Sequence, residues 1–200
     1  MTTRGAIGAV AVLLVAGCAE SAQADEGFTA ADATRIANTR PLPNGWTWPH
    51  DPEPPSQSAS TESADDDPLL AELQRQMADV VGIAEAGHKW RDDDKLGNLV
   101  AQVFGSGVDA HKALAALNGF SRGWGAKSGD ITRDEEVDGL GDEAWRLWVG
   151  GNGTQVTYHW RQDNLLLEVH VHCWGVCPSD VDAATRAWVD AIDEAARPSS

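Results

Sequence analysis

The sequence predicts an α+β domain, in which helices pack on the apolar face of an antiparallel sheet. Residues 156–173, VTYHWRQDNLLLEVHVHC, have the alternating pattern of two strands joined by a short turn. Three other segments have apolar residues at helical spacing. Strands bordered by helices favour one sheet with helices covering its apolar face. Residues 68–200 are enough for a single globular domain of this class.

The stretch 156–173 predicts a β-hairpin with Gln162 and Asp163 in the turn, so that Trp160 would pair with Leu165. Successive side chains of a strand point to opposite faces of the sheet. The predicted core face holds Val156, Tyr158, Trp160, Leu165, Leu167, Val169, Val171 and Cys173, and the opposite face holds Gln155, Thr157, His159, Arg161, Leu166, Glu168, His170 and His172. This division is unchanged if the two-residue turn moves by one residue, because odd positions still pair with even ones.

The other elements follow from apolar spacing and turn residues. A strand over 143–149 leads through the glycine-rich turn 150–153 into the hairpin, which makes a three-stranded C-terminal meander. We also expect, in chain order, a helix over 68–86, a loop over 88–94, a strand over 99–104, a helix over 108–120, a long connection over 121–141, and a final helix after Pro178 that is capped by Ser179 or Asp180.

Residues 1–18 predict export and attachment to lipid. Arg4 precedes an apolar run from Ala6 to Ala16, which is shorter than the roughly 20 residues that a membrane-spanning helix needs. The sequence Val-Ala-Gly-Cys at 15–18 resembles the end of a bacterial lipoprotein signal, which implies that Cys18 is diacylated and begins the mature protein. The alternative is an ordinary signal peptide cleaved elsewhere. We expect a protein anchored by lipid to the extracytoplasmic face of the cell membrane.

Residues 19–67 predict a tether between the lipid and the domain. Prolines, serines and acids are common there and branched aliphatic residues are few, so the segment buries too little apolar area to offset the entropy of ordering. Two parts differ: residues 29–40 have helical character, and Trp46 and Trp48 are large aromatic residues in a polar stretch. We expect both parts to dock on the domain. The alternative is an epitope for a partner in the cell envelope.

Charge and cysteine content limit the partners and the compartment. All 31 acidic residues lie after Cys18, whereas one of the 15 basic residues, Arg4, lies before it. The mature chain then has a formal charge of about −17, which argues against nucleic acid as a partner. With Cys18 carrying lipid, Cys173 and Cys177 remain as a pair, and an oxidising compartment predicts a disulfide between them.

Catalytic motifs are absent from the sequence. It contains no Gly-x-Ser-x-Gly, no His-Glu-x-x-His and no phosphate-binding glycine loop. Ser106 lies between two glycines, a pattern that is more typical of a turn from strand to helix. We therefore expect no enzymatic activity and no cofactor.

The nine tryptophans are the most unusual feature of the composition. Trp145, Trp160 and Trp188 lie on predicted apolar faces and are expected in the core. The candidates for a partly open aromatic groove that binds a small ligand or a protein partner are Trp124, Trp148 and Trp174.

An alternative function is extracytoplasmic metal binding. His159, His170 and His172 share the polar face of the predicted hairpin with Glu168. Imidazole and carboxylate groups could present ligands to zinc or copper. Histidine is also an ordinary residue on a sheet face that meets water or a covering helix.

Three short segments carry a resemblance to known proteins. They are Gly139-Leu140-Gly141-Asp142-Glu143-Ala144 before a strand, Arg161-Gln162-Asp163-Asn164 at the end of the next strand, and the closing amphipathic helix. Over roughly Leu99 to Ala196 the pattern resembles the small α+β domains of actinobacterial lipoproteins and the sensor-like ectodomains of bacterial Ser/Thr kinases. The resemblance implies a cell-surface binding or sensing module without catalytic residues, anchored by lipid instead of a kinase's membrane span.

Overall fold

The structure is a computed structural model, and it describes residues 27–38, 46–47, 68–90, 95–151, 153–174, 177 and 179–197. In this part of the chain seven strands form one antiparallel sheet in the order β1-β2-β3-β7-β6-β5-β4. The elements are α1 (Ala30–Ala37), β1 (Trp46–Thr47), α2 (Pro68–Met77), β2 (Val80–Trp90), β3 (Lys95–Phe104), α3 (Gly107–Ser128), β4 (Asp130–Glu136), β5 (Glu143–Gly150), β6 (Thr154–Gln162), β7 (Leu165–Cys173) and α4 (Val181–Ala196).

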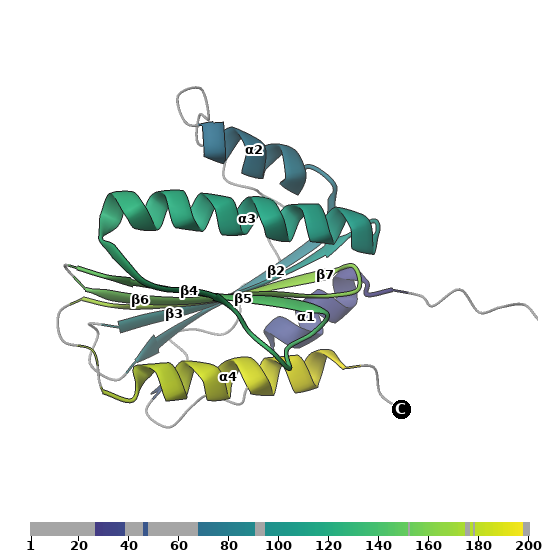
Figure 1. Ribbon diagram of the computed structural model, residues 1–200. Coiled ribbons are helices and arrows are strands. Elements are labelled where there is room, and N and C mark those ends of the chain that lie inside the picture. Colours follow the sequence, from purple (N-terminus) through teal and green to yellow (C-terminus); the bar gives the residue numbers. More distant parts are fainter. Residues whose placement is uncertain are drawn as a thin grey trace, which may run out of the picture.

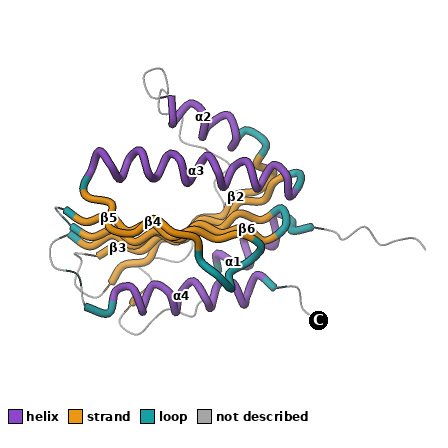
Figure 2. Tube along the Cα trace, viewed as in Figure 1, coloured by secondary structure: helices purple, strands orange, loops and turns teal. Residues whose placement is uncertain are grey.

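Helices cover both faces of the sheet (Figure 1). α3 lies across one face with α2 outside it, and α1 and α4 lie on the other face (Figure 2). The predicted α+β class, with an antiparallel sheet, a C-terminal meander and helices on its apolar face, is confirmed. The face of the sheet opposite α1 and α4 is covered as well. The helix predicted over 108–120 runs from Gly107 to Ser128 as α3, which is long enough to cross this face.

The hairpin of β6 and β7 has its side chains on the predicted faces, but its two-residue turn lies at 163–164, one residue later than predicted. Gln162 pairs with Leu165 and Trp160 with Leu167, so the predicted pairing of Trp160 with Leu165 is wrong. Asp163 has a φ of 51°, a left-handed conformation that aspartate tolerates in turns. All eight residues of the predicted core face belong to the larger hydrophobic core, on the side of α1 and α4.

Helix α1 belongs to the folded body although it lies within the predicted tether. Thr29 and Asp32 form a capping box at its N-terminus, with the Thr29 N–H donating to Asp32 Oδ2 over 2.9 Å. Ala33, Ile36 and Ala37 are buried in the larger core. The expected docking of this segment is confirmed, and the folded body begins before residue 68.

The structure describes only a few residues of the predicted signal segment and tether, residues 1–67. β1 pairs with β2 through Trp46 and Trp90, so the backbone at Trp46 docks on the sheet edge. Trp48, Cys18, the signal segment and most of the predicted tether lie outside the described residues. Among the described helices, none is both long and apolar enough to cross a membrane.

Two segments differ from the sequence-based expectation. The helix predicted over 68–86 ends at Met77, and Val80–Trp90 is a strand that pairs with β3. β-Branched residues at 80, 81 and 83 favour a strand, and pairing with β3 satisfies the backbone there. The connection predicted over 121–141 contains the end of α3 and the edge strand β4, whose exposed acids are compatible with an edge position.

Asn164 joins the hairpin turn to two distant segments. Its Nδ2 donates to the carbonyl oxygens of Phe28 (3.0 Å) and Phe104 (2.8 Å). Its Oδ1 accepts from the Phe28 N–H over 2.7 Å. The turn residue therefore fixes the chain that enters α1 against the end of β3.

Candidate ligand-binding site

Two half-exposed tryptophans line one pocket on the α3 side of the sheet. Trp124 in α3 is 41% exposed, and Trp174, which directly follows β7, is 51% exposed. The pocket has a volume of about 220 Å³ and is lined by Trp124, Ser128, Val149, Gly150, Gly153, Gln155, His172 and Trp174. Of the three tryptophans expected in an aromatic groove, the structure thus brings these two together. We call this site the indole pocket.

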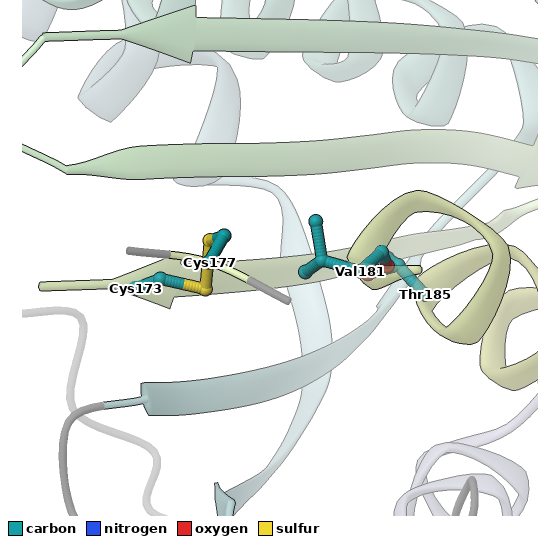
Figure 3. The surroundings of a disulfide bond; sticks show 4 residues. All are labelled: Cys173, Cys177, Val181 and Thr185. Carbon is teal, nitrogen blue, oxygen red and sulfur yellow. Dashed lines mark hydrogen bonds between the residues drawn. A yellow bond between two sulfur atoms is a disulfide. The ribbon is translucent and has the colours of Figure 1, made fainter. Parts of the chain in front are cut away.

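Trp174 is positioned by ring stacking and by a disulfide. The rings of His170, His172 and Trp174 follow one another along the same side of β7, with centroid separations of 6.2 Å and 4.5 Å. The predicted disulfide between Cys173 and Cys177 is confirmed, and it links the end of β7 to the chain that precedes α4 (Figure 3). Because Cys173 points into the core, the indole of the next residue emerges on the α3 side.

Trp124 is positioned by the close approach of α3 to the sheet. The neighbouring Gly125 is buried, and a Cβ atom at that position would lie only 2.9 Å from Val149 Cγ2. Glycine therefore allows the C-terminal part of α3 to pack directly on β5. This contact holds the adjacent Trp124 at the margin of the indole pocket.

Trp148 does not belong to the indole pocket, contrary to the sequence-based hypothesis. It packs against the larger core on the α4 side of the sheet, and the Arg133 guanidinium lies 5.0 Å from its ring centroid. Trp145, which was expected in that core, lies instead on the α3 side under the guanidinium of Arg122, at 4.4 Å. The prediction of Trp145 in that core is therefore wrong, because helices cover both faces of this sheet and each face buries apolar side chains.

The histidine face is a layer between the sheet and α3. His159 is 2% exposed, and its Nδ1 is 2.7 Å from Oδ1 of Asn118 in α3. Its Nε2 lies 3.7 Å from Glu168 Oε1. His170 Nδ1 is 3.4 Å from Gln155 Nε2. The predicted face of these residues is confirmed, and each imidazole has a neighbour within the protein.

Electrostatics in this layer follow from burial and pairing. Burial opposes ionisation of Glu168, but the neighbouring imidazoles of His159 and His170 outweigh it and keep the pKa of Glu168 below its ordinary value. Burial lowers the pKa of His170, and the neighbouring His172 and His159 lower it further against the opposing effect of Glu168. The pKa of His172 is lowered by burial. Among the described residues no group of three or more His, Cys, Asp or Glu side chains is arranged to hold a metal ion.

A second, larger cavity lies between α3 and the β4–β5 turn, and sequence reasoning missed it. It has a volume of about 420 Å³. Glu143 in its wall accepts hydrogen bonds from His111 (2.8 Å) and Arg161 (2.7 Å). Burial raises the pKa of Glu143, but these two partners outweigh it and lower the pKa overall. These partners come from α3 and β6, so no local sequence pattern connects them.

Arg122, which also lines this cavity, is paired within the protein. Asp134 accepts from Arg122 Nε over 2.8 Å and from Trp145 Nε1 over 2.5 Å. Arg122, Asp134 and Glu143 thus have partners within the protein, whereas the indoles of the indole pocket are half exposed. This difference makes the indole pocket the better candidate for a ligand.

Comparisons with known proteins give a structural neighbour and no family. No protein-family model matches the sequence, and no curated protein matches it. Among solved structures, the extracellular domain of PknH from Mycobacterium tuberculosis is similar to this chain, with a TM-score of 0.39 and 12% sequence identity. The alignment covers 84% of this chain and 92% of that chain. A likeness of this size carries no argument about function.

Proposed function

We propose that the protein is a non-enzymatic binding or sensing lipoprotein on the extracytoplasmic face of the cell membrane, and that a small ligand occupies the indole pocket. One observation carries the second part: two half-exposed indoles from elements far apart in sequence line the same pocket. A tryptophan side chain holds about 150–250 Å² of largely apolar surface, so exposing two of them together disfavours the free state. A ligand that covers them offsets this cost.

The positions of the indoles also support a binding site. Trp124 lies within the 22-residue helix α3, and Trp174 lies within the ring closed by the disulfide. Both side chains therefore start from backbone that is held in place before a ligand arrives. Such preorganisation improves affinity, because less conformational entropy is lost on binding.

The anchor is proposed from the N-terminal sequence. A diacylated Cys18 would bind the bilayer through two chains, each contributing about 0.8 kcal/mol per buried methylene group. The acidic chain would gain nothing from anionic headgroups or nucleic acid, so lipid is the proposed membrane contact. The domain would then meet its ligand or an envelope protein outside the membrane.

Replacing Cys18 tests the anchor. We expect wild-type protein to partition into the detergent phase and Cys18→Ser protein to remain aqueous or to stall during processing. The control is the double variant Cys173→Ser/Cys177→Ser, which keeps Cys18 and should still partition with detergent. Detergent partitioning of Cys18→Ser protein equal to wild type would contradict lipid attachment at this residue.

A ligand panel tests the indole pocket. The ¹⁵N-labelled full chain in detergent micelles is titrated with choline, benzoate, indole and the methyl glycosides of glucose, galactose, mannose and N-acetylglucosamine. We expect at least one compound to shift the indole N–H resonances of Trp124 and Trp174, which are assigned from the variants Trp124→Ala and Trp174→Ala. The control is Trp148→Phe, a tryptophan substitution on the opposite face. If no compound shifts either resonance, the pocket is not a ligand site.

A further inference from the structure

Among the described residues that line the indole pocket there is no Asp, Glu, Lys or Arg. The only titratable side chain among them is that of His172, and burial lowers its pKa, so the ring is neutral near pH 7. An anion would lose hydration here without meeting a positive charge, which is costly. An anion would also be repelled by the acidic chain. The lining therefore disfavours an anion, and a cation would find no carboxylate among the described lining residues to pair with.

The size of the pocket limits the occupant to about one ring. Its volume of about 220 Å³ is below the range of about 300–1,000 Å³ that is typical for drug-sized ligands. The two indoles remain 41% and 51% exposed, so a bound ring would keep part of its edge in water. A fully apolar ring gains most from a closed cavity. An open pocket of this kind favours a ring with a polar rim.

The lining offers stacking surfaces beside hydrogen-bonding groups. His172 stacks on Trp174 at an interplanar angle of 20°, which supports the indole from one side. Ser128, Gln155 and His172 supply a hydroxyl, an amide and an imidazole. The amide nitrogen of Gln155 lies 3.4 Å from Thr157 Oγ1 and 3.4 Å from His170 Nδ1, and both contacts are long for hydrogen bonds.

These features match the chemistry of a sugar ring. A pyranose has patches of C–H bonds on its faces and hydroxyl groups around its rim. The electron-rich face of an indole attracts the weakly positive C–H groups, while neutral polar side chains can bond to the hydroxyls. From the neutral lining, the single-ring volume and the two indoles, we propose that the indole pocket binds one neutral pyranose unit of a carbohydrate.

This inference rests on the proposed function, which makes the indole pocket a ligand site. The test uses the four methyl glycosides of the panel, followed by saturation-transfer difference NMR on the full chain in detergent micelles. We expect saturation transfer to the ring protons of at least one glycoside. The dissociation constant should rise at least tenfold in Trp124→Ala and in Trp174→Ala, and less than twofold in the control Trp148→Phe.

The outcomes separate the two proposals. Binding of choline, benzoate or indole at the two indoles, with no glycoside bound, would overturn the carbohydrate inference and leave the ligand site intact. Glycoside binding that persists in both alanine variants would overturn the inference by placing the sugar elsewhere. Absence of any response from the whole panel would overturn both proposals. Because both indoles are half exposed, circular dichroism of the variants should match the wild type.

Discussion

Truncation of Ile36 to alanine should destabilise the protein by about 2.5–4 kcal/mol. Ile36 is fully buried in α1, which packs against β2, β3 and α4. The change removes three carbon atoms, and at about 0.8 kcal/mol each the lost transfer free energy is near 2.4 kcal/mol. A cavity that fails to collapse adds about 24 cal/mol per Å³ and raises the cost toward the upper limit.

Urea denaturation of the disulfide-intact protein, followed by far-ultraviolet circular dichroism, measures this loss as a lower transition midpoint at an unchanged slope. Val108→Ala is the control, because it truncates an aliphatic side chain that is 63% exposed and should change stability by less than about 0.5 kcal/mol. A loss below 1 kcal/mol for Ile36→Ala would refute the docking of α1 in solution. The segment would then behave as part of the tether.

Three further predictions concern the turn, the histidine layer and the disulfide. Asn164→Ala removes three hydrogen bonds with the backbone, two of which the Asn164 amide donates to carbonyl oxygens, and should cost about 2–4 kcal/mol in urea denaturation. An effect under 1 kcal/mol would contradict this role. Acidification from about pH 7 to pH 5 should reduce the free energy of unfolding, because the pKa of His170 is lowered in the folded state and the unfolded chain therefore takes up a proton first. His170→Gln should make this decline shallower without abolishing it, since the pKa of His172 is lowered too. An unchanged pH profile in His170→Gln would refute the assignment. Reduction of the disulfide between Cys173 and Cys177 should lower the free energy of unfolding by about 2 kcal/mol, by the loop-entropy relation, and should weaken ligand binding. Equal binding with and without dithiothreitol would show that the disulfide does not position the indole of Trp174.

Sequence alone was sufficient where the structure depends on short-range periodicity. The two faces of the hairpin follow from the two-residue period of a strand, and a turn displaced by one residue leaves them unchanged. The disulfide could likewise be predicted, because Cys173 and Cys177 remain as a pair once Cys18 is assigned to lipid. The anchor at Cys18 also depends on local sequence and stays a prediction.

Tertiary structure decided the features that depend on distant partners. Residues 80–86 have helical spacing, yet pairing with β3 makes them a strand, because the inter-strand ladder and the β-branched side chains outweigh the apolar spacing. The sequence could not decide which of Trp145 and Trp148 faces α3 and which faces α4, since the pattern of β5 does not reveal that helices cover both faces of the sheet. The indole pocket joins a helix residue to a residue 50 positions later, Trp124 and Trp174, and only the packing of α3 on the sheet brings them together.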